Sequence, residues 1–199
     1  MAMSLRILIA EDEALNALAL RSQVEALGHT IVGPARNGRE AVELASRTPV
    51  DLALLDIRMP AMSGVEAAEE IVRHRPVPII LLTGFSEPEY VDQAVRAPVF
   101  HFLVKPVSLE DLAPAIGVAG ARFKEWLEFR EDAERIRRQI EERELLDQAK
   151  RVIMQARGLS EHGAYRLLQQ ESQRRSQPMV EIAQTILTAE SVLHDLSGS

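Results

Sequence analysis

Four ionisable residues follow short apolar runs of the sequence: Glu11 with Asp12, then Asp56, then Lys105. Such runs are typical of buried strands. In an open parallel sheet the carboxyl ends of the strands meet at one edge, where ligands bind. We therefore expect three carboxylates and one ammonium group to gather at the edge of a sheet.

This set of groups favours phosphoryl chemistry that depends on a cation. Three neighbouring carboxylates repel one another unless a hard divalent cation such as Mg²⁺ lies between them. A carboxylate beside such a cation can attack a phosphoryl group and form an aspartyl-phosphate. The transferred group then needs a positive charge, from Lys105, and a hydrogen-bond donor, from Thr83, which follows the apolar run 79–82. Taken singly, Lys105 could be a surface lysine and Thr83 a turn residue.

The first 120 residues alternate apolar runs with amphipathic stretches, and turn residues separate them. This alternation predicts an α/β domain with a five-stranded parallel sheet, doubly wound by helices on both faces. We expect strands at 5–10, 30–34, 52–55, 78–82 and 99–104, and helices at about 13–27, 38–46, 64–74, 87–96 and 108–120.

Helical periodicity replaces the strand signals from about residue 118. Apolar residues then recur at alternating spacings of three and four, as in a coiled coil: Trp126, Phe129, Ala133, Ile136 and Ile140. The next seam position is Arg143, where the pattern breaks or shifts. We expect a linker helix over 120–143 that forms a homodimer by pairing with a second copy; a single long helix packed on its own protein is the alternative.

Three helical segments follow in residues 144–199, and Ser160 could cap the second of them. Residues 150–175 hold six basic residues against two acidic ones, which could attract a polyanion or simply form a solvated face. For Tyr165, core packing is favoured over base stacking. The basic residues are Lys150, Arg151, Arg157, Arg166, Arg174 and Arg175.

Composition excludes several other classes of protein. The chain has 199 residues, a net charge of −7 and no cysteine, so it has neither a disulfide nor a thiolate metal site. No apolar stretch approaches the roughly 20 residues that span a bilayer, and the N-terminus lacks the layout of a signal peptide. Neither a Ser-His-Asp order, nor a Gly-rich phosphate loop, nor a zinc pattern is present. We expect a cytoplasmic protein that is neither an enzyme nor a membrane protein.

Residues 5–120 resemble a response-regulator receiver domain, which implies a flavodoxin-like fold for a domain over 1–119. The resemblance rests on Glu11-Asp12, Asp56, Met59-Pro60, Ser63-Gly64, Thr83-Gly84 and Lys105-Pro106.

The resemblance also implies a role for each residue of the site. Asp56 would accept phosphate from a sensor histidine kinase, while Thr83 and Lys105 would bind the phosphoryl oxygens. Phe102 matches the family's switch aromatic, and the Lys105–Pro106 peptide is expected to be cis. Mg²⁺ would be held by Glu11, Asp12, Asp56 and the backbone carbonyl of Arg58.

Residues 144–199 resemble the ANTAR domain, a family that binds RNA in transcription antitermination. The resemblance rests on 148–154, 158–160, Ala164-Tyr165 and Ile182-Ala183. It implies an all-α, three-helix output domain that binds hairpin RNA. The six basic residues are the cations available in this segment for contacts with RNA. Two alternatives stay open. Gly158-Leu159-Ser160 could be the turn of a DNA-binding helix-turn-helix, or the module could bind a protein partner.

Overall fold

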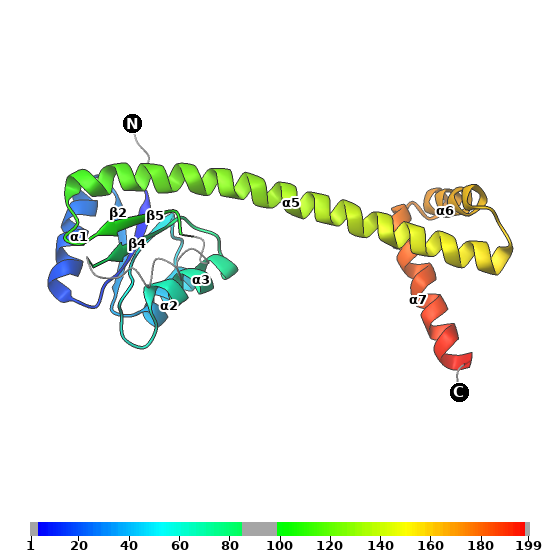
Figure 1. Ribbon diagram of the computed structural model, residues 1–199, viewed down its shortest axis with the longest axis horizontal. Helices are drawn as coiled ribbons and strands as arrows, with labels where there is room; N and C mark the ends of the chain where they lie inside the picture. The colour runs from blue at the N-terminus through cyan, green and yellow to red at the C-terminus, as the bar shows by residue number, and fades with distance from the viewer. Residues whose placement is uncertain (1–3, 85–98, 198–199) are drawn as a thin grey trace. The chain divides into compact units, whose positions relative to one another are not determined.

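The structure is a computed structural model that describes residues 4–84 and 99–197 (Figure 1). Its elements in chain order are β1 (Arg6–Ala10), α1 (Ala14–Ala26), β2 (Thr30–Ala35), α2 (Gly38–Arg47), β3 (Leu52–Asp56), α3 (Gly64–His74), β4 (Ile79–Thr83), β5 (His101–Val104), α5 (Leu109–Arg157), α6 (Glu161–Arg175) and α7 (Met179–Ser197). The helix expected at 87–96 lies outside the described residues. Within the described part, no helix is long and apolar enough to span a bilayer.

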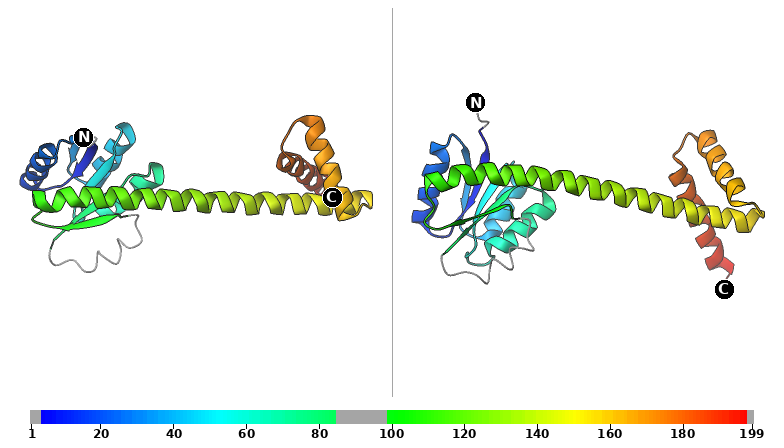
Figure 2. Two further views of the ribbon diagram at one scale, coloured as in Figure 1. Left: turned by 90° about the horizontal axis from the view of Figure 1, so that it is seen from above. Right: turned by 45° about the horizontal axis from the view of Figure 1, so that its top comes forward.

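The five strands form one parallel sheet in the order β2-β1-β3-β4-β5 (Figure 2). Every residue of β3 and β4 is buried, as expected for strands covered on both faces. Helices α2 and α3 pack on one face, while α1 and the first turns of α5 pack on the other. The predicted doubly wound α/β fold is confirmed.

Helix α5 runs from Leu109 to Arg157 as one helix of 49 residues. It joins the predicted helix at 108–120, the linker helix at 120–143 and the first helical segment of the C-terminal module. The change of pattern at Arg143 is therefore no break in the helix. The chain divides into two compact units, Met1–Glu128 and Phe129–Ser199, and the boundary falls within the predicted linker.

Trp126 belongs to the core of the first unit. Its ring stacks on Phe123 at a centroid distance of 5.9 Å and meets the edge of Phe100 at 5.9 Å. It packs against the apolar clusters on both faces of the sheet. This corrects the prediction that Trp126 opens an exposed seam. The exposed apolar positions of α5 begin instead at Phe129.

The second unit has a small core in which two residues from each of three helices meet. These are Ala149 and Ile153 of α5, Ala164 and Leu168 of α6, and Ile182 and Ala183 of α7. Ser160 caps α6 as predicted, because its hydroxyl accepts a hydrogen bond from the Gly163 amide. The ring of Tyr165 is 42% exposed and stays outside this core, so the preferred core-packing interpretation is wrong.

Candidate metal centre and phosphoacceptor site

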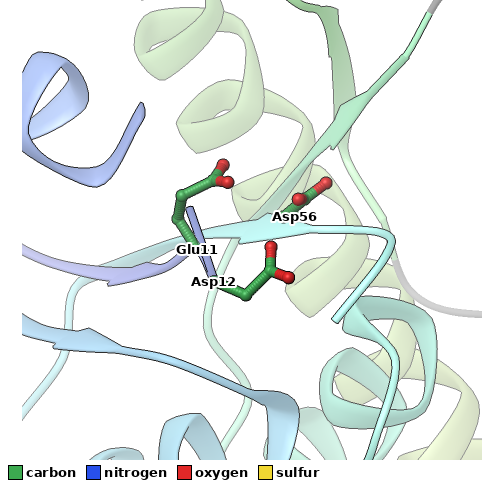
Figure 3. A group of neighbouring side chains, drawn as sticks. All are labelled: Glu11, Asp12 and Asp56. Atoms are coloured by element: carbon green, nitrogen blue, oxygen red, sulfur yellow. The ribbon is translucent and has the colours of Figure 1, made fainter. Parts of the chain in front are cut away.

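Glu11, Asp12 and Asp56 lie together at the ends of two neighbouring strands (Figure 3). Strand β1 pairs with β3 in parallel, with Ala10 opposite Leu55, so the residues that follow emerge at the same edge. One oxygen from each carboxylate lies within 4.8 Å of the other two. Because the ligand atoms are all carboxylate oxygens and Asp12 is exposed, the cluster suits a hard cation that keeps some of its waters.

Lys105 is the positive partner of the acidic cluster. Its Nζ atom lies 2.6 Å from Oδ2 of Asp56 and 2.7 Å from Oε2 of Glu11, and its side chain is 23% exposed. The backbone fixes its place, since the Lys105 amide donates to the carbonyl of Thr83 at the end of β4. The Lys105–Pro106 peptide is cis, as expected.

The pKa values of Asp56 and Lys105 reflect this arrangement. Burial raises the pKa of the Asp56 carboxyl to about 6, even though Lys105 donates a hydrogen bond to it. The negative charge of Glu11 acts in the same direction as burial. Burial alone would lower the pKa of Lys105, but its hydrogen bonds to Asp56 and Glu11 raise it overall. A bound cation would favour the ionised form of Asp56.

Thr83 is the last residue of β4, and Phe102 lies on the neighbouring strand β5. Thr83 is buried, and its hydroxyl donates to the carbonyl of Gly84 at 3.2 Å. Phe102 is half-buried and packs against the same apolar cluster as Trp126. The Arg58 amide lies 3.4 Å from Oδ1 of Asp56, so the loop after β3 folds back toward the Asp56 carboxylate.

Gly64 keeps that loop close to Asp56. A Cβ atom on Gly64 would overlap the carbonyl oxygen of Asp56. The next helix is fixed by a capping box, in which Ser63 and Glu66 each bond to the backbone amide of the other. We identified the Ser63-Gly64 pair in the sequence, but its spacing alone does not reveal the contact with Asp56.

Gly38 is a supporting residue that sequence reasoning missed. Its amide donates to the carbonyl of Met62 at 3.1 Å, and a Cβ atom there would lie 2.6 Å from the same oxygen. The start of α2 thereby supports the loop that carries Ser63 and Gly64. The available signal was the Asn37-Gly38 pair, which by itself is typical of a turn.

The six basic residues of the second unit lie on α5 and α6 in different surroundings. Lys150 forms ion pairs with Asp147 and Glu161, and Arg174 and Arg175 both pair with Glu171. The other three are exposed and form no ion pair with another described residue: Arg151, Arg157 and Arg166.

Comparison with known families finds a match for the α/β unit and a second match for the C-terminal helices. Residues 7–117 match the response regulator receiver domain, and residues 134–187 match the ANTAR domain. The chain belongs to the response regulators and carries an ANTAR output domain. Both matches indicate a regulatory protein rather than an enzyme.

One curated relative aligns with this chain over most of the length of both proteins. The chain is 38% identical over 182 residues to the transcriptional regulatory protein PdtaR of Mycobacterium tuberculosis, which covers 92% of this chain and 89% of the relative.

Solved structures resemble the receiver domain. One is the receiver domain of a modulated diguanylate cyclase from Desulfovibrio desulfuricans, with a TM-score of 0.58 and 36% identity over 61% of this chain and 98% of that one. Another is the receiver domain of the Pseudomonas aeruginosa sensor histidine kinase PA1611, with a magnesium ion coordinated in its active-site cleft. It has a TM-score of 0.54 and 28% identity over 59% of this chain and 99% of that one.

Proposed function

We propose that a sensor histidine kinase phosphorylates Asp56 and that the modified protein controls gene expression by binding RNA and preventing transcription termination. The phosphorylation of Asp56 is supported by its surroundings, because Asp56 contacts the ammonium group of Lys105 and lies beside two further carboxylates. The ANTAR match supports the proposed RNA binding.

Glu11, Asp12, Asp56 and the backbone carbonyl of Arg58 would hold Mg²⁺. The magnesium ion in the related Pseudomonas aeruginosa receiver domain supports this proposal. When bound, the ion supplies positive charge that offsets the carboxylates and the incoming phosphoryl oxygens. Lys105 would turn from the carboxylates to the phosphoryl group, and the hydroxyl of Thr83 would donate to one of its oxygens.

The kinase would approach along α1. This helix begins at Ala14, directly after the acidic pair, and presents Leu15, which is 82% exposed, and Leu18, which is also exposed. A phosphohistidine can reach Asp56 only if the kinase packs beside the acidic pair, and these leucines offer apolar surface there.

The phosphorylation signal would reach α5 through the core of the first unit. Phe102 and Trp126 pack against the same apolar cluster. A movement of Phe102 toward phosphorylated Asp56 and Thr83 would change the packing of Trp126 and therefore of α5. Phosphorylation would shift the population from the arrangement of the unmodified protein to this second arrangement.

A second copy of the chain would cover the exposed apolar residues of α5. Phe129, Ile136 and Ile140 are exposed at coiled-coil spacing, and Phe129 is 76% exposed. Pairing with the same helix of a second protomer would bury all three. We therefore propose a homodimer.

The RNA site would be built from the basic residues of α5 and α6, some in contact with the RNA and others holding the helices in place: Lys150, Arg151, Arg157, Arg166, Arg174 and Arg175. The exposed ring of Tyr165 can stack on an unpaired base of a hairpin loop. A DNA-binding helix-turn-helix is the second candidate, because only residues 158–160 separate α5 from α6.

A gel-shift experiment distinguishes RNA binding from DNA binding and from binding to a protein partner. The purified chain is tested with and without a small phosphodonor and Mg²⁺, against hairpin RNA and matched duplex DNA. Phosphate-dependent binding to hairpin RNA is the expected result. Binding to duplex DNA would favour the helix-turn-helix, and binding to neither would point to a protein partner.

A further inference from the structure

Lys150 is held between two carboxylates. Its Nζ atom lies 2.7 Å from Oδ1 of Asp147 and 2.7 Å from Oε1 of Glu161, and its side chain is only 15% exposed. Hydrogen bonds to Asp147 and Glu161 raise the pKa of Lys150, so the ammonium group stays charged. The group therefore already has two anionic partners within the protein.

The Lys150–Glu161 pair spans the turn between α5 and α6. Helix α5 ends at Arg157, Gly158 takes a positive φ of 64°, and Glu161 is the first residue of α6. A carboxylate in the first turn of a helix is also favoured by the helix dipole. Other ion pairs of this unit, such as Arg137–Glu141 and Arg174–Glu171, lie within one helix. The Lys150–Glu161 pair instead links the first turn of α6 to α5, with the Glu161 side chain 71% exposed.

Arg151 has a different environment, although it is the next residue along α5. Successive residues of an α-helix point about 100° apart. Arg151 is exposed, as are Arg157 and Arg166, and none of the three forms an ion pair with an acid among the described residues of this unit. The pKa of Asp147 is lowered mainly by its hydrogen bond with Lys150, and the nearby charges of Arg143 and Arg151 lower it further. These three guanidinium groups can meet a phosphate without first breaking an ion pair of their own.

We propose that Lys150 is a positioning residue of the RNA site, which sets α6 on α5 through Glu161, and that Arg151, Arg157 and Arg166 bind the phosphates. This inference rests on the proposed RNA-binding function. A phosphate that approached Lys150 would meet Asp147 and Glu161 as well. One positive and two negative charges offer a polyanion no net attraction.

The decisive variant is Glu161→Gln, measured for affinity to a hairpin RNA chosen from a pool with randomised loops. If Lys150 bound phosphate directly, removal of the neighbouring carboxylate would free its charge and tighten binding. As a positioning residue, Lys150 loses its partner on α6, so binding weakens severalfold. Glu171→Gln is the matched control, because it frees Arg174 and Arg175 within one helix and leaves affinity unchanged or higher. Tighter binding by Glu161→Gln would overturn the proposal.

The salt dependence of binding gives a second readout that a purely structural defect would not move. When a basic residue no longer neutralises a phosphate of single-stranded RNA, the slope of log affinity against log salt falls by about 0.7. Arg151→Gln should lower the slope by this amount. Lys150→Gln should weaken binding at the same slope, and Lys150→Arg should restore it. An equal decrease of slope in Lys150→Gln and Arg151→Gln would contradict the proposal.

A double-mutant cycle of unfolding, without RNA, separates this inference from the proposed function. Lys150→Gln and Glu161→Gln should be non-additive in the full chain, because each removes the same interaction. Additive effects would overturn the positioning role. If the wild-type protein binds no RNA, the proposed function and the phosphate assignment fail together, and the cycle still decides whether Lys150 ties α6 to α5.

Discussion

Lys105 donates a 2.6 Å hydrogen bond to Asp56, although the two residues follow strands that are not neighbours. Asp56 ends β3 and Lys105 follows β5, and β4 lies between these two strands. The reach of the lysine side chain across β4 brings its ammonium group to the acids at the end of β1 and β3. Lys105 thus offsets the repulsion between Glu11 and Asp56 in the absence of a cation.

Lys105→Met should strengthen Mg²⁺ binding and weaken phosphorylation. Removing an ammonium group that lies 2.7 Å from Glu11 removes a charge that repels the incoming cation. The phosphoryl oxygens lose the same charge, so less phosphate should accumulate on Asp56. Calorimetric titration with Mg²⁺ and intact-mass measurement after treatment with a phosphodonor test the two parts. Weaker Mg²⁺ binding by this variant would contradict the account.

The raised pKa of Asp56 predicts a pH-dependent stability without Mg²⁺. The unfolded carboxyl releases its proton near its ordinary pKa of 3.8, whereas the folded one retains it up to about 6. The folded state therefore binds more protons over this interval, and the free energy of unfolding falls as pH rises through it.

Asp56→Asn should remove most of this pH dependence. At pH 7.5 without Mg²⁺ the variant should be more stable than the wild type by on the order of 1–3 kcal/mol, and at pH 4 the two should be nearly equal. Added Mg²⁺ should stabilise the wild type more than the variant. Chemical denaturation at both pH values tests this, and an unchanged difference between them would argue against a protonated, buried Asp56.

Gly64→Ala should destabilise the first unit by about 2 kcal/mol or more, because the new methyl group overlaps the Asp56 carbonyl. Phosphate uptake should fall with it, since the loop after β3 must move. Gly117→Ala is the control: a Cβ atom there meets nothing within 4 Å, so helix α5 should gain about 0.5–1 kcal/mol. Equal unfolding curves for the two variants would contradict the close approach of Gly64.

Trp126→Ala and Phe129→Ala should differ although the two residues lie three apart on α5. Trp126 packs in the core of the first unit, so its removal should lower the free energy of unfolding by about 2–4 kcal/mol. Phe129 is exposed, so its removal should leave that stability unchanged and weaken the proposed dimer. Thermal unfolding and sedimentation velocity measure the two effects. A dimer unaffected by Phe129→Ala would remove the coiled-coil proposal.

The α/β fold and the acidic cluster could be predicted because both follow from strand ends. Once the apolar runs are assigned as parallel strands, Glu11 and Asp56 must emerge at one edge. The same reasoning fails where tertiary contacts decide whether a side chain is buried. Trp126 fits the heptad spacing, but spacing cannot tell that Phe100 and Phe123 cover one side of it.

Local pattern also fails where a contact joins distant parts of the chain. The need for glycine at position 38 comes from Met62, which belongs to another loop. The pairing of Lys150 with Glu161 depends on how α6 packs on α5. The number of basic residues in the sequence does not reveal this arrangement. Tyr165 follows the buried Ala164, yet it is exposed and does not belong to the core of the second unit.

Phosphorylation and RNA affinity measured on the same samples test the central claim most directly. Wild-type protein and Asp56→Asn are treated with a phosphodonor and Mg²⁺, checked by intact mass, and titrated against hairpin RNA. The account predicts one added phosphate and stronger RNA binding for the wild type, and neither change for the variant. Phosphate uptake by Asp56→Asn, or RNA affinity that is the same for phosphorylated and unmodified wild type, would contradict it.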